Sequence, residues 1–216
     1  MSEKVVLETP VLRKNDELAA ENRAWFAARR CTVLNLMSAP GAGKTTLLEK
    51  TLPRLAARRR CAVIEGDLQT DLDAARIRAT GIAAHQINVN SCHLDARMIA
   101  EAALRLEAER PDLLFIENIG NLVCPAAYDL GEHWRVTVFS AAEGADKPRK
   151  YPRMFHQSDA IVLNKIDLAP YCDVSIDELL ESVRAVSPHA AVFPLSSRSG
   201  EGLEPWIEWV ATREVR

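Results

Sequence analysis

The amino-acid sequence predicts an α/β fold in which a doubly wound, mostly parallel sheet is flanked by helices. Three observations support this fold class: apolar runs alternate regularly with helix-like stretches, the apolar runs are short and nearly continuous, and the chain has 216 residues. Continuous apolar strands are typical of parallel sheets that are covered on both faces. The length is enough for one sizeable core and falls short of two full domains.

The expected strands are short runs rich in Val, Ile, Leu and Phe, which pack well in a sheet. They span residues 32–37, 62–66, 84–89, 112–117, 135–140, 160–164 and 191–196. The intervening stretches are helix-like, at residues 44–58, 72–79, 93–109, 149–156, 175–186 and 203–212. The helical composition of residues 14–30 adds a helix that we expect to pack beside the first strand. We therefore expect an N-terminal helical extension, residues 1–30, on a single domain of residues 31–216.

The charge balance excludes several classes of partner. With 27 basic and 30 acidic side chains the formal net charge is −3, which gives no basic excess for binding nucleic acid. No apolar run approaches the roughly 18 residues that a membrane span needs. The opening stretch "MSEKVVLETPVLRKNDE" is too charged for a secretory signal. A cytoplasmic location is the expectation that follows.

Five cysteines without a signal peptide argue against a disulfide framework. Cys31 and Cys61 each open an apolar run and are interpreted as packing residues, while Cys172 lies in a predicted loop with no partner in view. Cys92 and Cys124 follow two different strands and need another explanation. Because loops that leave the carboxyl ends of parallel strands gather at one edge of the sheet, these two thiols are expected to approach each other there.

The stretch "SAPGAGKTTLLEK" after the first strand predicts a phosphate-binding loop. Its backbone N–H groups and the helix N-terminus would face the phosphates. Lys44 would reach the β and γ phosphates, and the Thr45 hydroxyl would ligate Mg²⁺. Ser38 stands where this motif usually has its first glycine. The candidate nucleotide-binding residues of this loop are Gly41, Ala42, Gly43, Lys44, Thr45 and Thr46.

A second motif, "NKID", predicts that the base is guanine. The Asp167 carboxylate can accept hydrogen bonds from N1–H and the exocyclic amine of guanine, whereas adenine presents the wrong pattern. The loop "SSRSGEG" after the last strand can supply backbone donors to the base. The candidate base-binding residues are Asn164, Lys165, Asp167, Ser196, Ser197 and Arg198. Two motifs in order predict a domain that binds GTP and GDP.

Acidic residues after the second and fourth strands are candidates for Mg²⁺ binding and hydrolysis. Asp67 would hold Mg²⁺ or orient the attacking water, and Asp71 is either a helix N-cap or a nucleotide ligand. Glu117 ends its strand in "ENIG", where it would contact Mg²⁺ while the Gly120 N–H senses the γ-phosphate. Lys44, Asp67 and Glu117 are thus the catalytic candidates. Since Asn121 rather than Gln follows Gly120, we expect hydrolysis slower than the roughly 1–100 s⁻¹ of kinases.

Six blocks in order resemble the HypB family, the nickel-inserting GTPases of nickel–iron hydrogenase maturation. They are "SAPGAGKTTLLE", "IEGDLQTDLDAARI", "NSCHLDARM", "IENIGNLVCPAAYDLGE", "EGADKPRKYPRMF" and "VLNKIDL". The resemblance spans roughly residues 30–205 and includes Ser38 and Glu117, the two departures from the general motifs. It implies a P-loop GTPase of the SIMIBI class, which dimerises with its nucleotide faces together. It also implies a HypA-type zinc accessory protein as a partner and delivery of nickel to the hydrogenase large subunit.

The resemblance further implies a nickel or zinc site shared across a homodimer, with Cys92, His93 and Cys124 as ligands. Thiolate and imidazole groups suit both Ni²⁺ and Zn²⁺. Adjacent residues seldom both face one centre, so a second copy of the chain is expected to complete four-coordination. From the residues alone, an inert thiol and a helix-capping His93 stay open. Some members carry an N-terminal Cys-rich or His-rich metal segment, and none is expected in this sequence, whose first histidine is His85.

The hypothesis for the mechanism is that GTP and metal promote the dimer and that GDP releases nickel. In the block "EGADKPRKYPRMF", Lys147 would lie near the nucleotide or the facing protomer, or else in a solvated basic turn. Three alternatives stay open, of which the first belongs to the same class and the other two belong to different classes. A urease-type accessory GTPase would carry a Cys-Pro-His motif, and a kinase or ATPase would lack the "NKID" motif. A nucleotide-dependent interaction module, like the GTPases that protect cobalamin enzymes, would need no metal ligands.

Overall fold

The computed structural model describes residues 3–67 and 70–216. Within these residues the strands form one seven-stranded sheet in the order β3-β2-β4-β1-β5-β6-β7, and every neighbouring pair is parallel. The strands are β1 (Thr32–Ser38), β2 (Cys61–Asp67), β3 (Ala83–Asn88), β4 (Leu113–Gly120), β5 (Trp134–Ser140), β6 (Ala160–Asn164) and β7 (Ala191–Pro194). The predicted doubly wound α/β fold is confirmed, with a sheet that is parallel throughout the described part.

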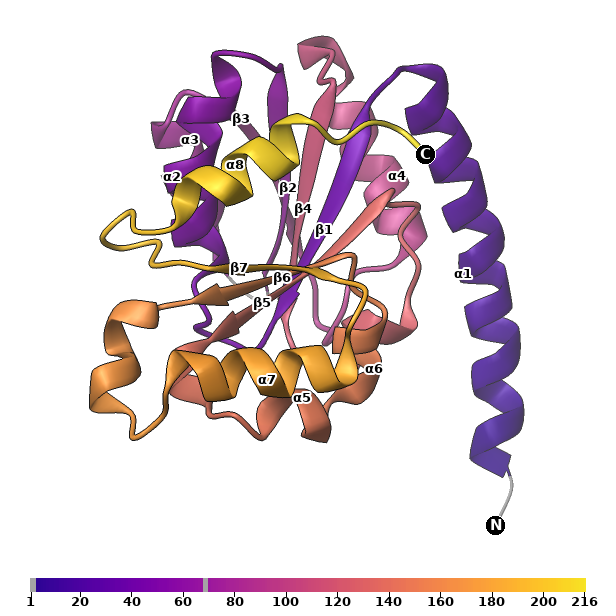
Figure 1. Ribbon diagram of the computed structural model, residues 1–216. Helices are drawn as coiled ribbons and strands as arrows, with labels where there is room; N and C mark the ends of the chain where they lie inside the picture. The colour runs from indigo at the N-terminus through magenta and orange to yellow at the C-terminus, as the bar shows by residue number, and fades with distance from the viewer. Residues whose placement is uncertain (1–2, 68–69) are drawn as a thin grey trace.

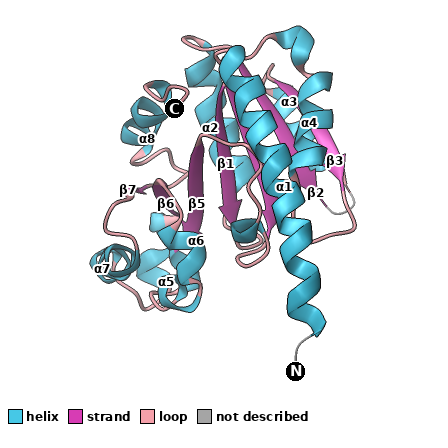
Figure 2. Cartoon of the chain, turned by 90° about the vertical axis from the view of Figure 1, so that its right-hand side faces the viewer, coloured by secondary structure: helices cyan, strands magenta, loops and turns pink. Residues whose placement is uncertain are grey.

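Helices cover both faces of the sheet (Figures 1 and 2). The α-helices are α1 (Glu3–Ala28), α2 (Lys44–Ala56), α3 (Leu72–Ala79), α4 (Ala96–Arg105), α5 (Lys147–Lys150), α6 (Pro152–His156), α7 (Ile176–Val186) and α8 (Leu203–Ala211). Short 3₁₀ turns lie at η1 (Glu107–Glu109), η2 (Pro125–Ala127), η3 (Ala141–Glu143) and η4 (Ile166–Tyr171). No helix in the described ranges combines the length and apolarity needed to cross a bilayer.

Three hydrophobic clusters correspond to these layers. Helices α2, α3 and α8 pack on one face, where Trp206 is the largest wholly buried side chain. On the other face α1 and α4 cover β1, β2 and β4, and Phe26 of α1 is almost fully buried. Helices α6 and α7 cover β5 and β6 on that same face, through Phe155 and Leu179. Burial on both faces explains why the strand sequences are nearly continuous in apolar residues.

Helix α1 begins at Glu3, well before the expected residue 14, and two further helices differ from the sequence-based expectation for local reasons. The helix expected at 93–109 begins only at Ala96, because Asp95 takes the N-cap position and its carboxylate accepts a hydrogen bond from Met98 N. The helix expected at 149–156 is two short helices that meet at Tyr151, directly before Pro152. A proline in the middle of a helix would remove one hydrogen bond and clash with the preceding turn. Because α4 begins only at Ala96, residues 93–95 lie in a loop, and His93 is outside the helix.

Helix α1 is attached to the rest of the domain by two buried amides. Asn15 bonds Asp129 O and the N–H of Ala96, and Asn22 donates to the carbonyls of Ala96 and Leu130. These contacts bind α1 to the start of α4 and to the turn before β5. The N-terminal part of α1 extends beyond the end of the sheet (Figure 2).

The turn before β5 needs a glycine where it meets α1. Gly131 has a φ of +87°, and a Cβ added there would lie 2.5 Å from Asn22 Cβ and 2.7 Å from Ala19 O. Real Cβ atoms do not approach other atoms so closely, so a side chain at 131 would push α1 away.

We expect Gly131→Ala to lower the free energy of unfolding by about 3 kcal/mol, because left-handed strain and steric overlap add together. Gly81→Ala is the matched control, since its φ is +86° and nothing lies within 4 Å of the added Cβ. Strain alone should cost that variant about 1 kcal/mol. Urea unfolding of both variants measures the difference, and equal losses would show that the contact between α1 and the turn contributes nothing.

Candidate nucleotide and metal site

The phosphate-binding loop lies between β1 and α2 at the carboxyl edge of the sheet. Lys44 begins α2 and is buried, and its Nζ donates a hydrogen bond to Ser38 Oγ at 2.9 Å. Ser38 thus has a specific contact at the position where this motif usually has a glycine. The Thr45 hydroxyl donates to Glu117 Oε1 at 2.9 Å, and Lys44 Nζ lies 3.9 Å from that same oxygen. The structure therefore brings three predicted site residues together from β4 and α2.

A further carboxyl group, Glu65 of β2, lies beside Glu117, because the two are partners in the register of β2 and β4. Burial, followed by the charge of Glu117, raises the pKa of Glu65 well above its ordinary range. Burial also raises the pKa of Glu117, while Lys44 and the hydrogen bond from Thr45 act to lower it. Glu65 Oε1 and Glu117 Oε2 have no hydrogen-bond partner among the described residues. Buried carboxylate and hydroxyl oxygens in this arrangement fit a hard divalent cation such as Mg²⁺.

The two aspartates of the β2 loop occupy different positions. Asp67 ends β2, and its Oδ2 accepts two hydrogen bonds from Thr70. The Thr70 hydroxyl donates at 2.6 Å and the Thr70 N–H at 3.3 Å. Asp71 sits at the N-cap position of α3, but its side chain makes no capping bond. It forms an ion pair with Arg78 instead. The expected N-cap position of Asp71 is therefore confirmed, while its side chain pairs with Arg78 of the same helix instead of capping the backbone.

Asn164 connects three loops at the other side of the edge. Its Nδ2 donates to Ala42 O at 2.9 Å, and its Oδ1 accepts from the N–H and hydroxyl of Ser197 at 3.0 and 2.9 Å. Lys165 Nζ donates to Gly41 O at 2.6 Å, so the "NKID" motif braces the phosphate-binding loop. Asp167 Oδ1 is buried and has no hydrogen-bond partner within the described part of the chain. That oxygen is the acceptor that a guanine amine and N1–H would satisfy.

The remaining predicted nucleotide ligands surround this edge with varied contacts. Thr46 accepts a hydrogen bond from Arg76, and Arg198 is exposed, next to buried Ser196 and Ser197. Lys147 lies 3.6 Å from Glu143 Oε2 and 5.4 Å from the centre of the Tyr151 ring. Gly43, on the left-handed side of the backbone map, precedes α2, and Gly120 ends β4 opposite Ser38. A role for Lys147 at the nucleotide stays a prediction.

Cys92, His93 and Cys124 converge at the same edge of the sheet. One ligand atom from each lies within 4.8 Å of the other two, and this cluster comes from the loops after β3 and β4, the two neighbours of β2. Cys92 Sγ lies 3.7 Å from His93 Nδ1. The expectation that adjacent residues seldom face one centre fails here, because Ser91 Oγ donates to His93 O and turns the loop. Two thiols and an imidazole can bind Ni²⁺ or Zn²⁺ and leave coordination positions open.

Two neighbours orient the metal-binding cluster. The His93 ring stacks on Tyr128, with ring centres 3.8 Å apart and planes inclined by 20°. Asn121 Oδ1 accepts hydrogen bonds from Val123 N at 2.7 Å and Cys124 N at 3.1 Å, so it fixes the turn that carries Cys124. The Asn121 side chain is therefore a structural part of the metal-binding loop.

The neighbouring Cys92 influences the ionisation of Cys124. A hydrogen bond with Cys92, partial burial and the charge of Cys92 raise the pKa of the Cys124 thiol to about 11. Burial lowers the pKa of His93, so the imidazole is neutral at physiological pH and can ligate a metal. A bound divalent cation would displace the thiol protons and would neutralise the repulsion between the resulting thiolates.

Sequence reasoning missed Glu65, Asn118, Asn121 as a loop brace and Tyr128 as a stacking partner. Glu65 had a usable signal, since a glutamate inside the apolar run "AVIEG" is unusual for a strand buried on both faces. Asn118 had a similar signal in "LLFIEN". For Tyr128 there was none, because its contact with His93 depends on the path of two loops.

This chain is similar to known proteins in both sequence and structure. The family described as CobW/HypB/UreG, nucleotide-binding domain, matches residues 32–194. Hydrogenase maturation factor HypB of Azotobacter vinelandii is 54% identical over 205 residues, which cover 94% of this chain and 68% of the relative. The factor of the same name from Escherichia coli K12 is 53% identical over 216 residues, with 99% and 74% covered. A crystal structure of HypB from Helicobacter pylori in complex with nickel has a TM-score of 0.86 at 40% identity and covers 91% of this chain and 93% of that one.

The raised pKa of Cys124 predicts that metal affinity rises with pH. Because metal binding displaces one or two thiol protons, the affinity for Ni²⁺ should increase by about tenfold to a hundredfold per pH unit between pH 6 and 8. Competition with a chromophoric chelator at several pH values measures this slope. Cys124→Ala should reduce the slope by removing one displaced proton. An affinity that is constant from pH 6 to 8 would mean that thiolates do not hold the ion.

Proposed function

Because this chain belongs to the CobW/HypB/UreG family and, within it, to the HypB hydrogenase maturation factors, we propose that it is a GTP-hydrolysing nickel metallochaperone. Nickel is its cargo, bound by Cys92, His93 and Cys124 and delivered to the large subunit of a nickel–iron hydrogenase. The observation that carries the proposal is the position of this ligand cluster, which shares one edge of the sheet with the phosphate-binding loop.

Guanine is the proposed base because the edge offers a buried acceptor for it. Asp167 Oδ1 lacks a partner in the described structure, and Asn164 fixes the surrounding loops. A ligand whose N–H groups reach Asp167 would satisfy this oxygen, whereas adenine would leave it unpaired. Lys44 would pair with the phosphates, and Arg198 and Lys147 would lie around the bound nucleotide.

Mg²⁺ is the proposed cofactor of hydrolysis, held by Thr45, Glu117 and Asp67. The partnerless Glu117 Oε2 and the Thr45 hydroxyl beside it support this assignment. When bound, Mg²⁺ neutralises charge on the β and γ phosphates. Hydrolysis is proposed to be slow, because Asn121 after Gly120 is engaged with the Cys124 loop and cannot orient a water.

A second copy of the chain is the proposed completion of the nickel site. One protomer offers three ligand atoms within 4.8 Å, and a two-fold related copy would add thiolates to reach four-coordination. GTP and nickel would promote this dimer, and conversion to GDP would release the ion. A HypA-type zinc protein is the proposed accessory partner. We place the reaction in the cytoplasm, where the free cysteines of the chain stay reduced. The ligands proposed for nickel also fit Zn²⁺.

The base assignment predicts a change of nucleotide preference. Asp167→Asn should weaken GDP binding by at least about a hundredfold, because the amide presents a donor to the guanine amine. The same variant should gain affinity for xanthosine diphosphate, whose 2-carbonyl accepts that donor. Calorimetric titration with GDP, xanthosine diphosphate and ADP measures both effects. Unchanged GDP affinity in the variant would exclude Asp167 as the base-reading residue.

The metal assignment predicts a nucleotide-dependent stoichiometry. Titration of nickel into metal-free protein with a non-hydrolysable GTP analogue should give about one ion per dimer, with mass and stoichiometry measured together. With GDP, nickel uptake should weaken and the dimer should dissociate. Cys92→Ala should lose the ion, whereas the control Cys172→Ala, outside the cluster, should keep it. Absence of nickel in both nucleotide states would exclude the metallochaperone role.

A further inference from the structure

Leu94, the residue after His93, anchors the metal-binding loop on β2. The Leu94 side chain is completely buried, and it lies directly on the backbone of Gly66. A Cβ added to Gly66 would lie 2.9 Å from Leu94 Cδ1 and 3.0 Å from Leu94 Cγ. The Leu94 side chain can therefore pack in this position only because residue 66 is glycine. Gly66 stands between Glu65 and Asp67. The loop that carries Cys92 and His93 therefore rests beside the acids at the end of β2.

The backbone of Leu94 is also bound to β4. Its N–H donates to Asn118 Oδ1 at 3.4 Å, and the same oxygen accepts from Ile119 N at 2.9 Å. Asn118 is almost completely buried and directly follows Glu117, the residue that contacts Thr45 and Lys44. One residue of the metal-binding loop is thus joined to both strands whose ends carry the proposed Mg²⁺ ligands.

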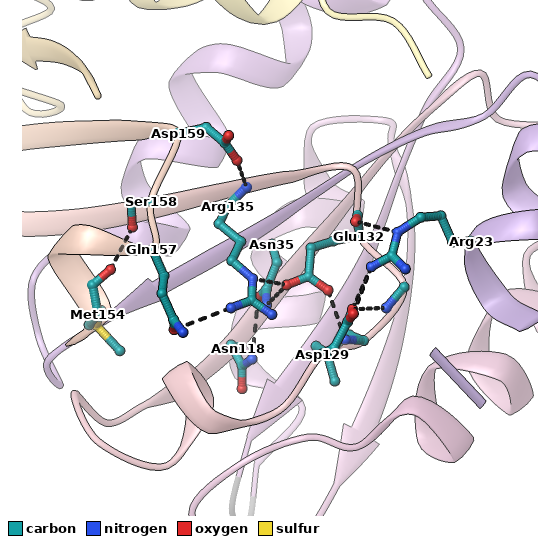
Figure 3. A network of polar contacts seen from close by, with 12 residues as sticks. Arg23, Asn35, Asn118, Asp129, Glu132, Arg135, Met154, Gln157, Ser158 and Asp159 are labelled. Atoms are coloured by element: carbon teal, nitrogen blue, oxygen red, sulfur yellow. Dashed lines mark hydrogen bonds and ion pairs between the residues drawn. The ribbon is translucent and has the colours of Figure 1, made fainter. Parts of the chain in front are cut away.

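A chain of buried polar groups fixes the orientation of Asn118 (Figure 3). Asn118 Nδ2 donates to Asn35 Oδ1 at 3.2 Å, and Asn35 Nδ2 donates to Glu132 Oε1 at 3.3 Å. Glu132 Oε1 also accepts from Arg135 Nε at 2.7 Å. Asn35 lies on β1, the strand that leads to the phosphate-binding loop. A buried network of this kind permits one arrangement at a time, so Asn118 moves with the backbones of β1 and β4.

The other half of the cluster depends on the same strand. Gly120 ends β4, and Asn121 immediately holds the turn that carries Cys124. Cys124 is therefore connected to β4 through the chain, and Cys92 with His93 through Leu94 and Asn118. A shift at the end of β4 would reach Cys124 along the chain, and it would reach Cys92 and His93 through Asn118 and Leu94. The distance between the ligands would then change.

We propose that Asn118 and Leu94 are positioning residues that couple nucleotide state to nickel affinity. The inference rests on the proposed function and adds the residues that connect its two sites. Presence of a γ-phosphate sets the position of Glu117 and Gly120, Asn118 follows Glu117, and Leu94 transmits this position to Cys92 and His93. Coupling of this kind is a free energy that both ligands share, and it can be measured as a ratio of affinities.

The test is the ratio of nickel dissociation constants with GDP and with a non-hydrolysable GTP analogue. For the wild type we expect a ratio in the usual range of allosteric coupling, about 5-fold to 150-fold. In Asn118→Ala the ratio should fall to within about twofold of one, while nickel affinity without nucleotide changes by less than about threefold. Leu94→Ala should reduce the ratio independently. The nickel–thiolate charge-transfer band gives a second readout, which should respond to nucleotide in the wild type and not in the variants.

Thr137→Ala is the control for loss of a buried polar contact. Thr137 lies on β5, is fully buried and bonds Ser158, so its removal should lower stability and leave the ratio intact. A wild-type ratio retained in folded Asn118→Ala or Leu94→Ala would overturn this inference and leave the proposed function in place. A wild type that binds nickel equally in both nucleotide states would overturn the inference together with the proposed gating. A wild type that binds no nickel would exclude the proposed function itself.

Discussion

The structure depends on the polar end of β4, which lies between β1 and β2 in the middle of the sheet. Glu117 and Asn118 are buried there at the end of an apolar strand. Burying such groups is unfavourable unless they are paired, and they pair with residues of other elements as well as with the neighbouring Ile119 N–H. Glu117 contacts Thr45 and Lys44 of the phosphate-binding loop, while Asn118 contacts Asn35 and the N–H of Leu94. The positions of the phosphate-binding loop and of the loop at Leu94 therefore depend on the hydrogen bonds and the ion pair that Glu117 and Asn118 make.

This constraint gives the metal cluster its sensitivity. The cluster is built from the loops that follow β3 and β4, and both of its cysteines are free thiols. Leu94, which comes directly after His93, is bonded to Asn118, and Asn121 fixes the turn that carries Cys124. Cys92 and partial burial raise the pKa of the Cys124 thiol, so a bound cation would have to displace its proton. Metal binding would also require both loops to keep the three ligand atoms close together.

The sequence was sufficient to predict the fold and the approach of Cys92 to Cys124, for identifiable reasons. Short continuous apolar runs located the strands, and the rule that loops gather at the carboxyl edge placed Cys92 near Cys124. It was insufficient where the outcome depends on side-chain packing between elements. The start of α4 is fixed by Asp95, two residues beyond His93, and Glu65 and Asn118 acquire their roles only from the register with β4 and the path of the loop at Leu94. His93 joins the cluster because Tyr128 stacks on it, a contact with no signature in spacing.

The most direct test of the central claim, that one strand end couples nucleotide to nickel, is the reciprocal measurement. The affinity for a non-hydrolysable GTP analogue, relative to GDP, would be measured in the presence and absence of nickel. Linkage requires that nickel favours the GTP analogue by the same factor by which the analogue favours nickel, and Cys92→Ala should abolish that factor. A preference for the GTP analogue that is the same with and without nickel would contradict the account.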